Sequence, residues 1–401
     1  MKKTVALLFL GLGVALSGAK DLAVIKQQKP ERIQPQQQLQ QLPLVESSSQ
    51  QEFLGIDEQL WGNAYSAGDR QGLLQSINHS LRYLNTSTAA QAYQNYPVPG
   101  ITRDRVRRSL LRFRQLLQNA RNAQEFQAAV EREFVFYKSV GRDNQGTVFF
   151  TGYYEPEYVA SRVPTPEYRY PLYRKPRNLD SWTTPHPSRA QLEGVDGLLG
   201  NNSTLAGREL LWMRDRFEAF LVHIQGSARF RMTDGTMMTV GYAGNTDYPY
   251  TSIGREIAKD GKLPLDGMTL PVLINFFRNN PQELNEYLPR NSRFIFFRET
   301  NGSPAMGSIG VPVTQERSIA TDKSLMPPGA LALIRTRIPY INQAGEIATP
   351  VVSRYVLDQD TGSAIKSPGR VDIFMGTGKV AGDRAGVVGW NGSLYYPLLK
   401  N

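Results

Sequence analysis

The stretch from Asp360 to Gly386, DTGSAIKSPGRVDIFMGTGKVAGDRAG, is the part of the chain around which we expect the fold to be organised. Asp360 and Asp372 lie twelve residues apart in it, among glycines and apolar pairs that alternate like short strands. Glycine permits tight turns and close approach of the backbone to a ligand. A positioned carboxyl group is a common acid or base in catalysis. The stretch therefore predicts that Asp372 is a catalytic acid and that the rest of the chain builds a groove over it.

The composition limits the kinds of catalytic group that the chain can use. The chain has 401 residues, no cysteine, three histidines and a formal charge of +10. This length suggests roughly two or three folding units, and the charge favours a polyanionic partner such as nucleic acid, a membrane surface or an acidic wall polymer. His79, His186 and His223 are widely separated, so we expect neither a metal site nor a Ser–His–Asp triad. Because we expect no thiol chemistry, no cofactor and no metal, the side chains of Asp and Glu are the groups expected to carry out catalysis.

The N-terminus predicts export. Two lysines precede the apolar run from Val5 to Leu16, and small residues follow up to Ala19, which together indicate a signal peptide over residues 1–19. The run is short for a membrane span, although a retained anchor is the alternative. Export makes nucleic acid an improbable partner. Residues 20–52 are rich in Gln, Pro and Ser and are interpreted as a flexible tether.

The remaining chain changes character at Gly146. Residues 53–145 predict helices at 56–84, from N-cap Thr102 to Ala120, and at 123–137; we interpret the arginine-rich face between 103 and 114 as solvated rather than wall-binding. The following residues predict two helices, at 252–260 and 270–279. They also predict strands at 147–154, 219–225, 227–232, 237–242, 294–297, 311–313, 330–336, 351–357 and 371–374. Short strands with frequent turns favour a small closed barrel.

Two further stretches could bind a saccharide. In FTGYYEP, which ends at Pro156, Tyr153 and Tyr154 must face opposite sides of a strand, so one of them is available to stack on a sugar ring. Ordinary strand packing is the alternative. The stretch beginning HIQGSARFRMTDG at His223 supplies neutral polar groups and aromatic faces, although an edge strand with a tyrosine-rich loop explains it slightly better. These groups are Gln225, Ser227, Asn245, Thr251, Tyr242, Tyr248 and Tyr250.

Asp322 lies in a third stretch, SIATDKSLMPPG, and completes a recognisable series. The pattern ATDxxxxPPG, DTGSAIK and VDIFMGxG resembles the three-aspartate (3D) domain. FTGYYEP, HIQGSARF and SIGVPVTQERSIATDKSLMPPG resemble, in the same order, the landmarks of the membrane-bound lytic murein transglycosylase A (MltA) family. The resemblance runs from Val148 to the C-terminus.

The resemblance implies a mainly β protein with N-terminal helices. The catalytic domain would be a double-psi β-barrel made of residues 146–158 and 301–401. A second β-domain, residues 159–300, would be inserted into it, and a glycan strand would lie in the groove between the two. The helical region 53–145 would pack on the barrel.

The resemblance also implies an enzyme that cleaves the β-1,4 bond between N-acetylmuramic acid and N-acetylglucosamine in peptidoglycan without water, leaving a 1,6-anhydromuramyl end. One carboxyl group can suffice because the substrate's own C6 hydroxyl is the nucleophile. Asp372 would be the acid and then the base, supported by Asp360 and Asp322. The residues that would contact the substrate are Thr151, Gly152, Tyr153, Tyr154, Gln225, Gly226 and Ser227.

Several alternatives stay open. Asp360 could be the acid and Asp372 a structural acceptor, and Asp322 could only cap backbone amides before the Pro-Pro-Gly turn. Lys366 could oppose a raised pKa of Asp372. The protein could also be a non-catalytic wall-binding module, or a hydrolase whose second carboxylate is Glu155. Because cysteine is absent, a lipoprotein anchor in the outer membrane is not expected, and we predict a monomer in the periplasm or cell envelope with peptidoglycan as its partner.

Overall fold

The computed structural model describes residues 42–47, 54–62 and 68–400. The predicted signal peptide and most of the predicted tether lie outside these residues. Residues 44–46 are an exception, because they form strand β1 (Leu44–Glu46), which pairs antiparallel with β2 (Phe134–Ser139). Leu44 is buried in the main core. This part of the tether prediction is therefore wrong, because one buried leucine and a strand pairing fix the segment.

The first sheet contains a closed ring. Its eight strands in the described chain follow the order β1-β2-β16-β11-β14-β10-β15-β3, and an additional pairing of β16 with β3 joins six of them into a barrel. The pairs β10–β14 and β15–β3 are parallel, whereas the others are antiparallel. Besides β1 and β2, the strands are β3 (Val148–Glu155), β10 (Ser318–Ala320), β11 (Leu331–Arg337), β14 (Val351–Asp360), β15 (Arg370–Thr377) and β16 (Gly389–Leu399). The predicted closed barrel is thus present.

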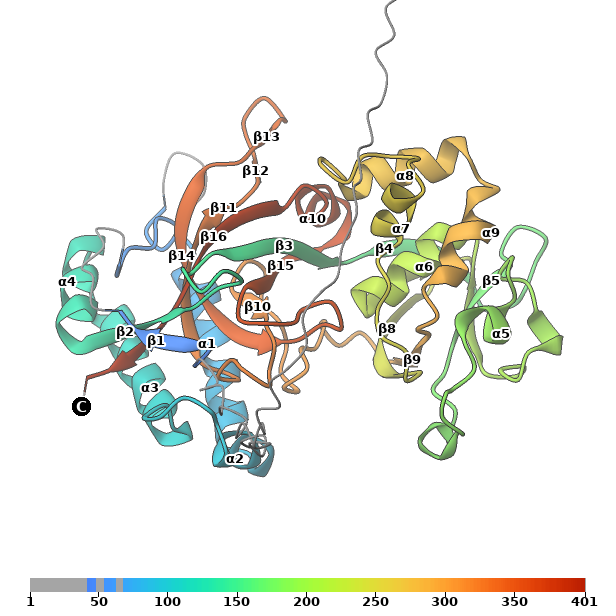
Figure 1. The fold of residues 1–401 in the computed structure, drawn as a ribbon. Coiled ribbons are helices and arrows are strands. Elements are labelled where there is room, and N and C mark those ends of the chain that lie inside the picture. The colour runs from blue at the N-terminus through green and yellow to red at the C-terminus, as the bar shows by residue number, and fades with distance from the viewer. Residues whose placement is uncertain (1–41, 48–53, 63–67, 401) are drawn as a thin grey trace, which may run out of the picture. The chain divides into compact units, whose positions relative to one another are not determined.

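Four helices cover this barrel on one side (Figure 1). They are α1 (Arg70–Leu84), α2 (Ser87–Gln94), α3 (Arg103–Asn119) and α4 (Ala123–Glu133). Phe113 of α3 packs edge-on against Tyr355 of β14, with ring centroids 4.7 Å apart. Buried Arg317 binds Asp57 at 2.6 Å and Asp69, the N-cap of α1, at 2.9 Å. The helices and the barrel therefore share one core.

The chain leaves the first sheet at Pro156 and returns after Glu299. Between them lies a sheet of order β5-β6-β4-β7-β8-β9 with its own apolar clusters. Its strands are β4 (Glu157–Ser161), β5 (Tyr170–Tyr173), β6 (Glu209–Met213), β7 (Ser227–Met232), β8 (Met237–Asn245) and β9 (Ile295–Glu299). Its helices are α5 (Arg189–Glu193), α6 (Arg216–Gln225), α7 (Ile253–Lys259), α8 (Leu270–Asn279) and α9 (Glu283–Tyr287). The predicted helix 270–279 is confirmed residue for residue.

The short remaining elements are a hairpin, three single-turn helices and α10. The hairpin consists of β12 (Tyr340–Ile341) and β13 (Ile347–Ala348), and the turns are η1 (Leu179–Ser181), η2 (Gly200–Asn202) and η3 (Leu288–Arg290). Helix α10 (Gly378–Ala385) packs against β3 and β15. The C-terminal part of the stretch from Asp360 to Gly386 is thus a helix rather than a turn.

Four other local predictions are wrong. Residues 219–225 belong to helix α6, not to a strand, because Ala219 and Val222 face one apolar cluster and Phe220 faces another. A helix that is apolar on both sides has no visible helical period. The predicted helix at 123–137 ends at Glu133 and continues as β2, the helix at 56–84 begins only at Arg70, and residues 311–313 form only an isolated bridge.

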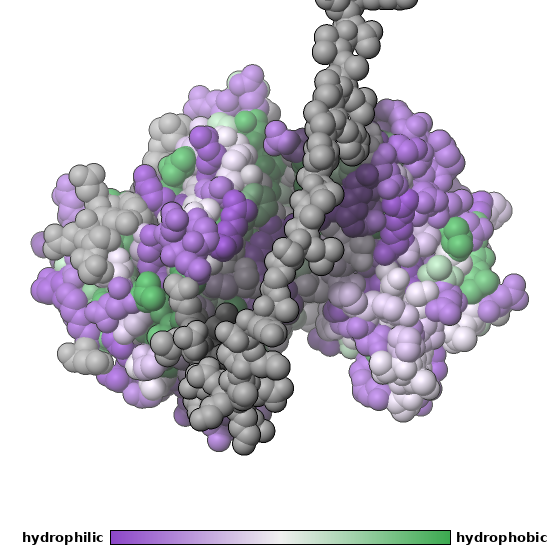
Figure 2. All heavy atoms as spheres, in the orientation of Figure 1, coloured by the Kyte–Doolittle hydropathy of each residue, from purple (hydrophilic) through white to green (hydrophobic). Residues whose placement is uncertain are grey.

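The surface is largely polar. Hydrophilic residues cover most of the described surface on the face shown in Figure 2, with hydrophobic residues in small separate groups. Within residues 42–47, 54–62 and 68–400, no helix has the length and apolar character needed to cross a membrane.

Candidate active site

Asp372 lies on β15 beside β3, where the parallel register places it opposite Thr151. The Thr151 hydroxyl donates a hydrogen bond of 2.9 Å to Oδ1 of Asp372. The other carboxylate oxygen has no hydrogen bond to any residue that the structure describes. Asp372 is half-buried and lines a cleft of about 660 Å³. One oxygen is therefore held, and the other is free to exchange a proton with a ligand.

The surroundings of Asp372 keep its proton bound to unusually high pH. Burial raises the pKa of Asp372 to about 6, and the nearby charge of Asp360 contributes in the same direction. The Arg370 guanidinium and the Thr151 hydroxyl oppose the rise, because both stabilise the carboxylate. The cation that opposes this shift is thus Arg370. Lys366, the candidate from the sequence, instead lowers the pKa of Asp322.

Asp360 ends β14 and has both carboxylate oxygens engaged. Tyr153 donates to Oδ2 at 2.8 Å, and the backbone amides of Ser308 and Thr361 donate to Oδ1 at 2.8 Å each. Burial raises the pKa of Asp360, and these hydrogen bonds together with Lys323 oppose the rise. Asp360 is therefore a fixed acceptor close enough to influence Asp372.

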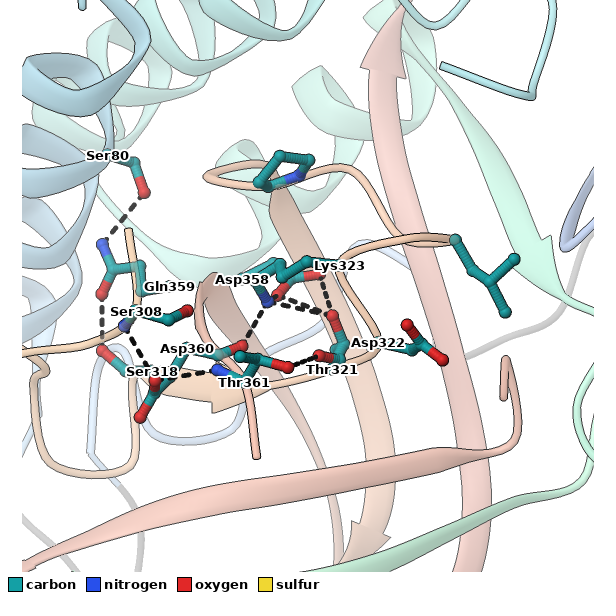
Figure 3. Close-up of polar contacts among 12 residues, drawn as sticks. Ser80, Ser308, Ser318, Thr321, Asp322, Lys323, Asp358, Gln359, Asp360 and Thr361 are labelled. Atoms are coloured by element: carbon teal, nitrogen blue, oxygen red, sulfur yellow. Dashed lines mark hydrogen bonds and ion pairs between the residues drawn. The ribbon is translucent and has the colours of Figure 1, made fainter. Parts of the chain in front are cut away.

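Asp322 is turned away from Asp360, as Figure 3 shows. Its carboxylate accepts hydrogen bonds from the Ser324 hydroxyl at 2.6 Å and from the backbone amide of Ser367 at 3.0 Å. Burial alone would raise the pKa of Asp322, but these bonds and Lys366 outweigh it and lower the pKa. Asp322 is not among the residues lining the cleft of Asp372. Asp322 therefore makes the contacts of a residue that caps backbone amides, which is the alternative role that the sequence suggests for it.

A buried network beside Asp360 was not foreseen from the sequence. Lys323 donates to the carboxylate of Asp358 and to the backbone carbonyl of Asp360. Asp358 also accepts from Tyr396 at 2.6 Å and from Thr321 at 2.8 Å. The alternation of Asp358 and Asp360 in the strand sequence LDQD was the available signal, because residues two apart face the same side of a strand. The network holds the backbone that carries Asp360.

The two adjacent tyrosines separate as the alternation predicts. Tyr153 faces the cleft, with its ring 5.2 Å from that of Phe374, whereas Tyr154 is buried on the other side of β3. A Cβ at Gly382 of α10 would lie 2.7 Å from the Tyr154 ring. A Cβ at Gly152 would lie 2.9 Å from a backbone atom of α10. Tyr154 thus packs against α10, and Gly152 allows that helix to approach.

The segment Gln225–Ser227 connects α6 to β7 beside the cleft. Gln225 accepts a 3.1 Å hydrogen bond from the backbone amide of Tyr154, which ties α6 to β3. Gly226 ends the helix in the left-handed conformation, with φ of 81°. All three residues line a second groove of about 460 Å³, which also contains Asp360. Tyr153 and Gln225 line both hollows, so the two are adjacent.

The other polar residues suggested by the sequence differ in whether they border the cleft or the second groove. Tyr250 lines the cleft of Asp372, and Tyr242 lines the second groove. Asn245 instead accepts hydrogen bonds from Tyr242 and from Arg293. Tyr248 uses its carbonyl oxygen to accept from Arg293, and Thr251 borders neither hollow.

His223 and Glu155 are committed to structural contacts. Burial and the charge of Arg189 lower the pKa of His223 well below its usual value, and its Nδ1 accepts from the backbone amide of Ile295 at 3.3 Å. Glu155 is 1% exposed and binds Arg229 at 2.6 Å and the Thr377 hydroxyl at 2.9 Å. The Glu155 carboxylate is therefore held in an ion pair, and Nδ1 of His223 is occupied as an acceptor.

Comparison with known proteins gives two domain matches. The family model for the MltA specific insert domain matches residues 149–298, and the model for the 3D domain matches residues 317–398. The membrane-bound lytic murein transglycosylase A of Escherichia coli K12 is 31% identical over 248 residues, which are 61% of this chain and 64% of that protein. A homolog from Buchnera aphidicola is 30% identical over 252 residues, with coverages of 62% and 66%. The chain thus spans less than two thirds of these relatives.

Solved structures share the fold. E. coli MltA with bound chitohexaose aligns with a TM-score of 0.67 at 24% identity, covering 90% of this chain and 95% of that one. A membrane-bound lytic murein transglycosylase from Agrobacterium tumefaciens aligns with a TM-score of 0.64 at 25% identity, covering 80% and 92%. The chain thus contains matches to the MltA specific insert domain and to the 3D domain, in that order, and it shares the fold of E. coli MltA.

Proposed function

We propose that this protein is a peptidoglycan lytic transglycosylase, which cleaves the β-1,4 bond between N-acetylmuramic acid and N-acetylglucosamine and leaves a 1,6-anhydromuramyl end. The observation that carries the proposal is the state of Asp372. Burial raises its pKa to about 6, Thr151 holds one of its oxygens, and the other oxygen lies unengaged in the cleft. A carboxylic acid placed in this way can protonate a leaving oxygen near neutral pH.

One carboxyl group performs both proton transfers in the proposed reaction. Protonated Asp372 gives its proton to the glycosidic oxygen while the bond to C1 breaks and positive charge develops on the muramyl ring. The resulting carboxylate then takes the proton of the C6 hydroxyl, whose oxygen attacks C1 and closes the 1,6-anhydro ring. The acid is regenerated, and no water is consumed. An attached nucleophile has a large proximity advantage over water.

The neighbours of Asp372 have supporting roles in this proposal. Thr151 orients the acid. Asp360, fixed by Tyr153 and two backbone amides, supplies the negative charge that helps to keep Asp372 protonated. Gln225, Gly226 and Ser227 border the groove for the glycan strand, together with Thr151, Gly152 and Tyr153. Tyr154 and Asp322 act through structure, the first by packing on α10 and the second by capping backbone amides.

The choice of Asp372 over Asp360 follows from their hydrogen bonds. Asp360 accepts from three donors through both of its oxygens, so three of its roughly four acceptor positions are occupied. Asp372 accepts from one. A carboxyl group that must release and regain a proton needs the free oxygen that Asp372 has.

The hydrolase alternative receives less support. A glycoside hydrolase needs a second carboxylate to activate water or to attack the sugar. Glu155 is buried in an ion pair with Arg229, and it borders the second groove rather than the cleft of Asp372. The non-catalytic alternative does not account for an acid whose proton is retained to unusually high pH.

The relatives support the wider proposal. They are named lytic murein transglycosylases, and the E. coli neighbour contains chitohexaose. We accordingly propose that the ring of six strands is the double-psi β-barrel of 146–158 and 301–401, that 159–300 is the inserted domain, and that 53–145 supports the barrel. We also propose a monomer that is exported to the periplasm or envelope.

Analysis of digestion products tests the function. The protein is incubated with purified peptidoglycan, and the released muropeptides are identified by mass. Anhydromuramyl ends support the proposal, reducing ends support the hydrolase, and the absence of products supports the binding module.

A further inference from the structure

The cleft of Asp372 is lined by many cations. Six basic side chains border it, whereas Asp372 is the single carboxylate among the lining residues that the structure describes. The basic residues are Arg142, Arg189, Arg255, Arg293, Lys366 and Arg370. A hollow lined by charges of one sign attracts ligands of the other sign.

Three of these cations have structural partners, and one of them is Arg142, which donates a hydrogen bond to Asn391 at 3.1 Å. Arg189 is buried, binds Glu193 at 3.1 Å and donates to backbone carbonyls. Arg293 donates to the carbonyl of Tyr248 and to Asn245. Their hydrogen bonds account for their positions, so they do not by themselves indicate a ligand.

Arg370 is different, because its guanidinium is stacked on an aromatic ring and forms no hydrogen bond or close ion pair with a residue that the structure describes. It lies 4.9 Å from the centre of the Phe149 ring, which Arg142 also approaches at 5.7 Å. Nε of Arg370 is buried and has no hydrogen-bond partner in the described chain. Arg370 and Asp372 are two residues apart on β15, so their side chains share the face of the strand that borders the cleft.

Arg255 and Lys366 are two further cations of the cleft without a close partner. Both are exposed at the cleft, and neither side chain forms a hydrogen bond or close ion pair with another described residue. Arg255 and Arg370 repel each other, which contributes to lowering the pKa of Arg370. Cations that gather around an open cleft and form no close ion pair within the described chain are suited to an external anion.

The sugar backbone of peptidoglycan is neutral, and its carboxylates are carried by the lactyl group of muramic acid or by the peptide attached there. We propose that Arg255, Lys366 and Arg370 form a subsite that binds a carboxylate of this muramyl substituent. This inference rests on the proposed function. Two residues of a strand span about 7 Å, so Arg370 lies within the reach of a substituent on the sugar that Asp372 acts upon. Arg255 and Lys366 line the same cleft.

Equilibrium binding with the catalytic acid replaced can test the subsite. In an Asp372→Asn background, Arg255→Gln combined with Lys366→Gln removes two of the cations without touching the acid's immediate neighbours. The matched control is Arg177→Gln combined with Arg231→Gln, which removes two exposed cations outside the cleft. Three probes are compared by calorimetry: neutral chitohexaose, peptide-free muramyl glycan strands, and peptide-bearing muropeptides.

The expected result is selective. We expect Kd to rise about tenfold for carboxylate-bearing probes in the Arg255→Gln/Lys366→Gln variant, to stay within about twofold for chitohexaose, and to stay unchanged in the control, because charge-assisted hydrogen bonds are lost. Weakening of the peptide-free strands alone assigns the lactyl carboxylate, because the attached peptide converts that carboxyl group into an amide. Weakening of the muropeptides alone assigns a peptide carboxylate, and weakening of both shows that the subsite accepts either carboxylate. Equal effects on all three probes, or no effect on any, overturn the subsite while the proposed function stands. Failure of the Asp372→Asn parent to bind any of the probes overturns the proposed function together with the subsite.

Discussion

Replacing Asp372 by asparagine should abolish activity and at the same time make the folded protein more stable at neutral pH. The substitution keeps the size of the side chain and an oxygen that can accept from Thr151. It removes the group that can ionise. If burial is what retains the proton on Asp372, the wild-type protein has an unfavourable charge to accommodate at neutral pH, and the variant does not.

The size of the gain follows from the two pKa values. The pKa of Asp372 is raised from the ordinary 3.8 to about 6 in the folded protein. The native state therefore binds this proton more tightly than the unfolded chain, and stability falls as pH rises through that window. The difference corresponds to about 3 kcal/mol above pH 6.5, about 2 kcal/mol at pH 5 and nearly zero at pH 3.

Urea unfolding of both proteins at several pH values measures this difference. Equal denaturant slopes allow the midpoints to be compared directly. Thr151→Val is the matched control, because it removes the hydrogen bond to Asp372 and leaves the carboxyl group in place. A gain that is absent at pH 7.5, or one that is the same at every pH, would refute the claim that burial raises this pKa.

Four further substitutions test the neighbours. Arg370→Gln removes a cation that stabilises the Asp372 carboxylate, so Asp372 should keep its proton to higher pH. The loss of kcat/KM on the alkaline side of a pH–rate profile should therefore move to higher pH, and a shift to lower pH would contradict this. Asp360→Asn should move the alkaline loss of kcat/KM to lower pH and should reduce activity without abolishing it. Complete inactivity of this variant, together with normal turnover by Asp372→Asn, would identify Asp360 as the acid. Glu155→Gln should lower the free energy of unfolding by about 1–3 kcal/mol, because its ion pair is lost. The folded variant should still yield anhydromuramyl ends, and loss of all products would show that Glu155 takes part in the chemistry. Gly152→Ala should cost about 1–3 kcal/mol in urea unfolding because its Cβ would meet α10, and a variant of wild-type stability would show that the helix can move.

Local signals in the sequence predicted the elements whose causes are local. Thr102 was expected to begin a helix, and its hydroxyl accepts from the amide of Arg105 at 3.2 Å. The helix Leu270–Asn279 combines an apolar face with a proline in its first turn. The closed barrel followed from short strands and turns, although its strand order did not.

Elements whose pattern depends on tertiary packing were missed. Helix α6 lies between two apolar clusters, so its residues show no polar face. Helix α10 begins with two glycines in its first five residues, which suggests turns, but Gly382 is needed because the Tyr154 ring occupies the space of a side chain. Neither packing partner is near in the sequence.

The candidate site shows the same division. Asp372 could be selected from the sequence because carboxylates were left after thiols and histidines had been excluded and because the resemblance separated it from Asp360. Its contact with Thr151 joins residues 221 positions apart, and only the parallel pairing of β3 and β15 brings them together. The link from Lys323 to Asp358 and Asp360 likewise depends on the pairing of β10 with β14.

Digestion of peptidoglycan in water enriched with ¹⁸O tests the central claim most directly, because it asks whether solvent enters the product. The account predicts that the wild-type protein releases anhydromuramyl ends that carry no label and that Asp372→Asn releases none. Labelled reducing ends from the wild-type protein, or unlabelled anhydromuramyl ends formed at the normal rate by Asp372→Asn, would contradict it.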